Sequence, residues 1–138
     1  MILKLGKACI EKRVGEFQCR STPMNFLNRK VHWTTRSKWS HAWKDQVSIA
    51  LNDLGKEIKS KKYPLAKAKI IIKLFTCSLM DYDGAYGSVK PCLDSLTDNG
   101  IIMDDSPKYI DLKVEQVKVN KKCDERVEME ILEVNKTQ

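Results

Sequence analysis

The sequence predicts a small α/β domain in which a mixed β-sheet packs against two main helices. Apolar residues recur at helical spacing over residues 40–60, and an alternating apolar run covers residues 66–80. Two more alternating runs follow at 110–119 and 127–131. Because 138 residues suit one hydrophobic core, we expect a single domain spanning residues 1–138.

The first helix is expected to follow a long irregular segment. Alternation predicts one or two strands within residues 1–20, and a loop is expected over residues 21–39. The helix is predicted to begin at Ser40, a candidate N-cap, and to end before Pro64, which cannot continue a helix. Its apolar stripe consists of Trp43, Val47, Leu51, Leu54 and Ile58.

A strand and a short helix are predicted next along the chain. In the strand over 66–80, alternating apolar residues share one face and lysines share the other. Gly84 and Gly87 mark a loop, and Ser88 is a candidate cap for a helix that stops at Gly100. The apolar strand residues are Ala68, Ile70, Ile72 and Leu74, the lysines are Lys67, Lys69 and Lys73, and the helical stripe is Val89, Leu93 and Leu96.

Two strands joined by a polar turn at residues 121–125 are predicted to form an antiparallel hairpin near the C-terminus. Apolar residues alternate at 110, 112 and 114, and then shift phase to 117 and 119. This shift predicts a β-bulge near Glu115–Gln116. The second strand carries Val127, Met129 and Ile131 on its apolar face.

Charge and cysteine content restrict the class of protein. Lysine and arginine number 25 against 18 acidic residues, and the net charge of +7 suits a polyanionic partner, although charge alone does not require one. Five widely spaced cysteines without a CxxC pair argue against a zinc site and against a disulfide framework. We therefore expect reduced thiols in a cytoplasmic protein, with no membrane span and no signal peptide.

Asp81 and Asp83 directly follow the predicted strand of residues 66–80. In extended chain, residues two apart point to the same side, so these carboxylates would repel each other unless a cation such as Mg²⁺ offset the repulsion. Taken alone, an Asp-x-Asp-Gly sequence is more often a polar turn. An EF-hand loop is excluded, because positions 6 and 12 counted from Asp81 are Tyr86 and Cys92.

A second acidic pair, Asp104 and Asp105, follows an apolar triplet and forms either another wall of a metal site or a solvated turn. Since neighbours in extended chain point to opposite faces, only one of the two is expected to join Asp81 and Asp83. Lys90 lies in the first turn of the predicted short helix, where a cation opposes the helix dipole. We expect a phosphate or a carboxylate to offset that cost, unless the ammonium group lies in water.

Cations alternate with aromatic rings over residues 25–44, which suits contact with phosphates and stacking on bases. The tryptophans can instead belong to the core or to a dimer interface. We assign Trp43 to the core and leave Trp33 and Trp39 open. The candidate DNA-binding residues are Arg29, Lys30, His32, Arg36, Lys38, Lys67, Lys69 and Lys73.

Taken in order, these motifs resemble the RusA family of Holliday-junction resolvases. The resemblance rests on Asp81-Tyr-Asp83, on the run from Lys90-Pro-Cys-Leu-Asp94-Ser-Leu96 to Gly100, on Asp104-Asp105, and upstream on Pro23-Met-Asn25. It covers roughly residues 20–132, and the first fifteen residues lie outside it. Gly84 stands where the family has asparagine, and about three extra residues separate Asp83 from Lys90.

The resemblance implies a RusA-like fold and a phage-type, metal-dependent endonuclease that resolves four-way DNA junctions by paired symmetric nicks. It implies that Asp81, Asp83 and Asp105 hold Mg²⁺ or Mn²⁺, with Asp104 as a further candidate ligand, and that Lys90 is the active-site lysine. It also implies a homodimer that acts on branched DNA in a bacterial host, encoded by a phage or prophage, without a small-molecule cofactor. The alternatives are a nuclease for other branched DNA, a catalytically silent DNA-binding module of the same fold, and an interaction protein without a nucleic-acid partner.

Overall fold

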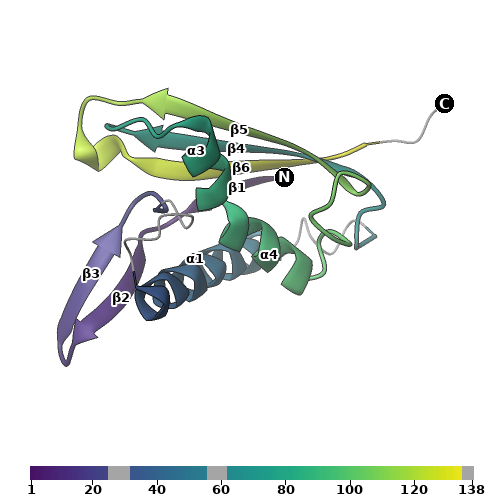
Figure 1. Ribbon diagram of the computed structural model, residues 1–138. Helices are drawn as coiled ribbons and strands as arrows, with labels where there is room; N and C mark the ends of the chain where they lie inside the picture. Colours follow the sequence, from purple (N-terminus) through teal and green to yellow (C-terminus); the bar gives the residue numbers. More distant parts are fainter. Residues whose placement is uncertain (25–31, 56–61, 135–138) are drawn as a thin grey trace.

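A mixed four-stranded sheet of order β1-β6-β4-β5 forms the centre of the computed structural model, which describes residues 1–24, 32–55 and 62–134 (Figure 1). The central strand β4 pairs in parallel with β5 and antiparallel with β6, and β6 pairs antiparallel with β1. The predicted α/β class with a mixed sheet is therefore confirmed. The strands of this sheet are β1 (Ile2–Leu5), β4 (Ala68–Thr76), β5 (Ile110–Lys118) and β6 (Arg126–Glu133).

One face of the sheet carries the core. The apolar side chains predicted to share one face of β4 are all buried, as are the alternating residues of β6. They pack with the buried faces of α1 and α4, which lie on the same side of the sheet (Figure 1). Among the described residues, no helix is long and apolar enough to cross a membrane.

The N-terminal segment contributes three strands, where one or two were predicted. Leu3 and Leu5 of β1 are buried in the main sheet. Strands β2 (Ala8–Arg13) and β3 (Glu16–Arg20) form a separate hairpin that projects beside α1, with Gly15 at positive φ in its turn (Figure 1). The first fifteen residues, which lie outside the family resemblance, are thus part of the fold.

A disulfide joins Cys9 and Cys19 across the β2–β3 hairpin. The two residues are directly opposed in the antiparallel register, which brings their side chains close together. The prediction of reduced thiols is wrong for this pair, because only the hairpin register reveals that the two cysteines face each other. Cys77, Cys92 and Cys123 are free.

Breaking this disulfide is expected to lower the free energy of unfolding. The bond closes a loop with a sequence separation of 10, and loop-closure entropy for a loop of about this length is worth roughly 2–3 kcal/mol. Urea unfolding of the wild type and of a Cys9→Ser/Cys19→Ser variant measures the difference. Three reactive thiols in the unfolded wild type are expected, and five would contradict the pairing.

The first helix, α1 (Trp33–Asp53), begins seven residues before the predicted start. His32 is the N-cap, and its Nδ1 accepts a hydrogen bond from the Thr34 backbone N–H at 3.2 Å. The predicted cap at Ser40 is therefore wrong. The buried stripe of α1 begins at Trp39, one turn before the predicted first member, Trp43. The end of the predicted helix, including Ile58, lies outside the described residues.

Two short helices, α3 (Tyr82–Ser88) and α4 (Lys90–Asp98), connect the parallel strands β4 and β5. The loop predicted at Gly84 and Gly87 is wrong, because Gly84 and its neighbour Ala85 are buried within α3. Ser88 does not cap α4; its hydroxyl donates to the Ala85 carbonyl at 2.7 Å. The predicted stop at Gly100 is confirmed by its left-handed φ of +74°.

Strands β5 and β6 do not form the predicted hairpin. A short 3-10 helix, η1 (Lys122–Asp124), carries the chain past β4, so that β4 lies between them. The register of β5 on β4 runs without interruption from Ile110 to Lys118, so the predicted bulge is also wrong. The phase shift has another cause: β5 is an edge strand, and its polar Gln116 contacts the segment before α3.

Candidate active site

The segment that carries the first acidic pair is held in place by Gln116. Its side-chain Oε1 accepts a hydrogen bond from the Met80 backbone N–H at 2.7 Å, and its Nε2 donates to the Met80 carbonyl at 2.8 Å. The amide thus pairs with the backbone as another strand would. This contact fixes where Asp81 begins the helix α3.

Asp81 and Asp83 lie at the N-terminus of α3, so the extended chain that was assumed for this pair ends at Asp81. Asp81 is the N-cap, and its Oδ1 accepts a hydrogen bond from the Gly84 backbone N–H at 2.8 Å. Asp83 lies in the first helical turn. Asp81 is the extended N-cap residue and Asp83 lies inside the helix, so the same-side geometry of a continuous extended chain does not apply to this pair. The helix N-terminus supplies the positive potential that stabilises both charges.

Lys90 lies at the start of α4 between two carboxylates. Its Nζ donates to Asp94 Oδ1 at 2.9 Å and also forms a short ion pair with Asp105 Oδ2. Of the three environments considered for this lysine, which were phosphate, carboxylate and water, the structure shows a carboxylate partner. The hydrogen bond from Lys90 lowers the pKa of Asp105, and those to Asp105 and Asp94 raise the pKa of Lys90.

The pH dependence of the Lys90–Asp105 pair follows from these directions. The lowered pKa of Asp105 gives a stabilisation that is present above the ordinary aspartate value of about 3.9 and is lost as pH falls through the lower folded value. The raised pKa of Lys90 gives a second stabilisation of the fold. It is present below the ordinary lysine pKa of about 10.4 and is lost as pH rises through the higher pKa of Lys90 in the folded protein.

Replacing Lys90 with methionine is expected to raise the pKa of Asp105 towards that of an ordinary aspartate. Carboxyl NMR titrations of the wild type and of Lys90→Met measure the change. Lys113→Met is the matched control, because Lys113 pairs with Glu115 on β5. An Asp105 titration that is identical in the wild type and in Lys90→Met would show that the pair does not form in solution.

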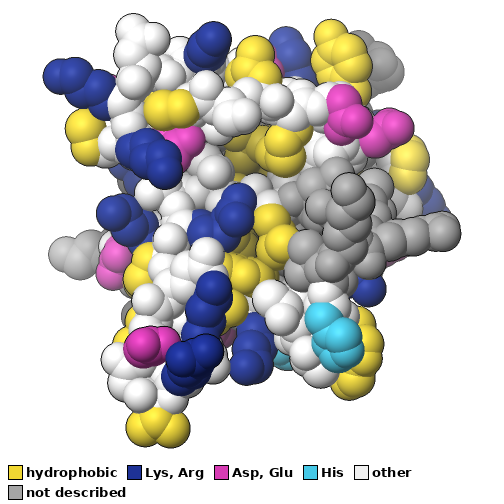
Figure 2. Space-filling model, turned by 60° about the vertical axis from the view of Figure 1, so that its left-hand side comes forward, with side chains coloured by type: hydrophobic (Ala, Val, Ile, Leu, Met, Phe, Trp, Pro, Cys, Tyr) yellow, Lys and Arg dark blue, Asp and Glu magenta, His cyan; other side chains and the backbone are white. Residues whose placement is uncertain are grey.

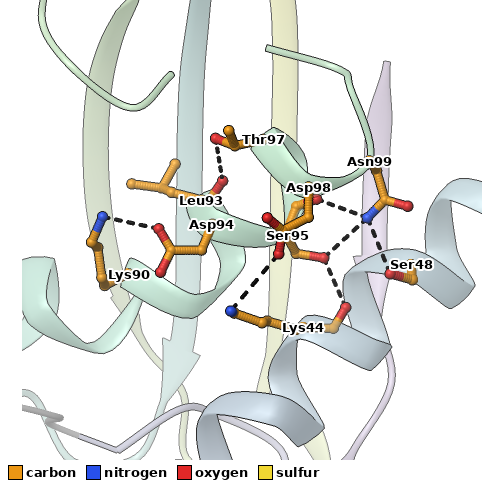
Figure 3. A network of polar contacts seen from close by, with 9 residues as sticks. All are labelled: Lys44, Ser48, Lys90, Leu93, Asp94, Ser95, Thr97, Asp98 and Asn99. Carbon is orange, nitrogen blue, oxygen red and sulfur yellow. Dashed lines mark hydrogen bonds and ion pairs between the residues drawn. The ribbon is translucent and has the colours of Figure 1, made fainter. Parts of the chain in front are cut away.

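Helix α4 is anchored to α1 by a polar network (Figure 3). The buried Ser95 donates to the Lys44 carbonyl at 2.8 Å, and Asn99 Nδ2 donates to Ser48 Oγ at 3.1 Å. Lys44 also forms an ion pair with Asp98 at 3.8 Å. This network fixes the position of the helix whose first residue is Lys90.

The first turns of α1 and α4 border one pocket of about 280 Å³. Trp33 and Arg36 line it from α1, and Lys90, Pro91 and Asp94 line it from α4. Trp33 is 67% exposed and lines the pocket, whereas Trp39 and Trp43 are buried in the core. The pocket therefore joins part of the basic and aromatic segment to the candidate active-site lysine.

The remaining candidate DNA-binding residues are dispersed. Arg29 and Lys30 lie outside the described residues, and Lys38 faces a different pocket, between α1 and β2. Lys73 stands in register between Glu115 of β5 and Glu128 of β6, and Lys69 is paired with Asp111. Neighbouring acids therefore offset the positive charge of Lys69 and Lys73. Lys67 is half-buried before β4.

The four candidate active-site residues form two pairs in the structure. Asp81 and Asp83 lie at the N-terminus of α3, and Asp105, from the segment after α4, pairs with Lys90 at the N-terminus of α4. Within the described part of the chain, no three acidic, histidine or cysteine side chains form a group that could hold a metal ion. Asp104 is exposed next to Asp105.

Sequence reasoning missed the residues that position this site. Gln116 holds the Asp81 segment, and Glu125 Oε2 accepts hydrogen bonds from the Cys77 backbone N–H at 2.9 Å and from Thr76 Oγ1 at 3.3 Å. The phase shift at 115–116 was the only signal for Gln116. Compared with models of known protein families and with curated proteins, the chain matches none.

Proposed function

We propose that this protein is a metal-dependent endonuclease that cuts branched DNA, with four-way junctions as its substrate and the RusA resolvases as its relatives. One observation carries the proposal. Lys90 and Asp105, fifteen residues apart in sequence, meet at the start of α4 beside the pocket lined by Trp33 and Arg36. A lysine, an arginine and an exposed tryptophan that line one pocket suit contact with a phosphodiester and with its bases.

The candidate metal ligands fit the chemistry of a hard divalent cation. Asp81, Asp83 and Asp105 offer only carboxylate oxygens, the ligands that Mg²⁺ and Mn²⁺ prefer, and all three are exposed or half-buried. Because the described residues do not bring these carboxylates into one group, they would hold the ion, with Asp104 as a further candidate, only after the N-terminus of α3 and the Asp105 segment come together around it. The bound ion would lower the pKa of a water molecule and stabilise charge on the scissile phosphate.

The chain's own residues act on the phosphate and on one another. Asp105 and Asp94 keep the Lys90 ammonium group protonated and hold it at the mouth of the pocket. Its positive charge stabilises the negative charge that grows on the phosphate oxygens during cleavage. Two copies related by a twofold axis would present two such sites to the opposed strands of a symmetric junction.

Cleavage of a labelled four-way junction and of a linear duplex with the same sequence tests this proposal. Paired nicks in the junction alone, present with Mg²⁺ and absent with EDTA, are the expected result. Equal cutting of both substrates would support nuclease activity and contradict a specificity for junctions.

A second candidate function is a DNA-binding module without nuclease activity. The observation that favours it is the use of Asp81 as a helix cap, apart from Asp105. Junction binding without cutting, in either Mg²⁺ or Mn²⁺, would support this second function and overturn the first.

A further inference from the structure

A second pocket lies at the end of the sheet from which the chain leads to Asp81. It has a volume of about 510 Å³ and is formed where the base of the β2–β3 hairpin meets η1. Lys7 and Arg20 line it from the hairpin side, and Lys122 and Cys123 line it from η1. None of these residues was assigned a role by the motifs or by the candidate active site.

The pocket has an excess of positive charge. Within the described residues, Lys7, Arg20 and Lys122 form no ion pair. The acidic residue that lines the pocket, Glu125, already accepts hydrogen bonds from the end of β4. Three cations around one hollow repel each other, and an anion bound between them would relieve that repulsion.

Arg20 is held in a fixed position to receive such an anion. Its Nε donates to the Thr22 carbonyl at 3.2 Å, and its guanidinium group lies 5.8 Å from the ring centre of the buried Trp39. The terminal Nη groups make no hydrogen bond within the described residues. A guanidinium fork held in this way suits bidentate contact with phosphate oxygens.

The surroundings of the pocket favour a polyanion over a small ion. Figure 2, which brings the hairpin side forward, shows lysine and arginine side chains gathered over this face with few acidic ones among them. On the sheet itself, by contrast, neighbouring acids offset Lys69 and Lys73. Part of the excess positive charge of the described residues therefore lies on this face.

We propose that the pocket of Lys7, Arg20 and Lys122 binds a phosphate of the DNA backbone outside the candidate active site. The identity of the macromolecule rests on the proposed function. The chain from Cys77, which is bonded to Glu125, to Asp81 spans at most about 14 Å. At 3.4 Å of helix axis per nucleotide, this reach corresponds to at most about four nucleotides between the Glu125 side of the pocket and Asp81.

Cys123 reports on the occupancy of this pocket. Its thiol is exposed and free, so a neutral alkylating reagent modifies it when the pocket is empty. At a DNA concentration of about ten times Kd, bound DNA should slow this modification roughly tenfold. The reaction is followed by peptide mass spectrometry with EDTA present, so that no cleavage occurs. Inorganic phosphate is the second probe.

A Lys7→Gln/Lys122→Gln variant is expected to lose this protection. Both lysines are exposed, so the fold is retained. The slope of log K against log salt concentration for duplex binding should fall by roughly 0.9, because one phosphate contact is lost. The matched control is Lys62→Gln/Lys108→Gln, with the same change of charge, at the end of the sheet where β4 and β5 begin.

The outcomes separate this proposal from the proposed function. Junction cleavage, together with an unchanged salt slope in the Lys7→Gln/Lys122→Gln variant and no protection of Cys123 by DNA, would overturn phosphate binding at this pocket and leave the nuclease proposal in place. Protection that is lost in the lysine variant, without any cleavage, would support the pocket and overturn the nuclease. Protection by inorganic phosphate but not by DNA would assign the pocket to a small anion and overturn the proposal.

Discussion

An Asp83→Asn variant is expected to lose junction cleavage while it keeps its fold and its affinity for DNA. A metal-bound phosphate gains several kcal/mol of transition-state stabilisation, which corresponds to a loss of roughly 10²–10³-fold or more in the single-turnover rate. Asp83 is exposed in the first turn of α3, so its carboxylate contributes at most about 1 kcal/mol to the helix. Binding is expected to stay equal or to tighten, because a charge that repels phosphate is removed.

The matched control for this measurement is Asp111→Asn. Asp111 is an exposed aspartate on β5, outside the candidate active site, and its replacement changes the net charge by the same amount. We expect it to cut the junction at the rate of the wild type. Equal rates for Asp83→Asn and the wild type would remove Asp83 from the metal site.

Replacing Trp43 with alanine is expected to give the largest loss of stability of any single substitution discussed for this protein. Its side chain is completely buried where α1 meets the sheet. Truncating a buried tryptophan costs about 3–5 kcal/mol, through lost burial and the cavity left behind. Urea unfolding monitored by circular dichroism measures the loss.

Two further substitutions on α1 give the matched comparison. Trp33→Ala should change stability by about 0.5 kcal/mol or less, because Trp33 is exposed. Trp43→Phe should cost less than Trp43→Ala, because it keeps a large apolar ring and because the buried Trp43 Nε1 has no hydrogen-bond partner among the described residues. Equal losses for the two alanine variants would show that α1 does not pack as the structure has it.

The candidate site was predictable as a set of residue types but not as an arrangement. The position of Lys90 at the start of a helix indicated that an anion lies nearby, and Asp94 and Asp105 supply it. Asp81 and Asp83 were expected to share one side, on the assumption of extended chain. The segment is helical because Asp81 caps it and because Gly84 and Ala85 pack into the interior.

Periodicity by itself determined the buried faces of β4, β6 and α4. The apolar faces of β4, β6 and α4, the core position of Trp43 and the stop at Gly100 all follow from the order of residue types, because burial of apolar surface acts on each element where it stands. The composition likewise determined the excess of positive charge. It did not indicate where on the surface that charge has no acidic neighbour.

The tertiary structure alone decided which elements are neighbours. Strand β4 lies between β5 and β6, Cys9 faces Cys19, and Gln116 reaches across to Met80. Each depends on contacts between residues distant in sequence or on strand register, which local patterns do not encode. The same holds for the meeting of Lys7, Arg20 and Lys122 around one pocket. Their positive charges repel one another, and only the folding of the elements that carry them brings them together.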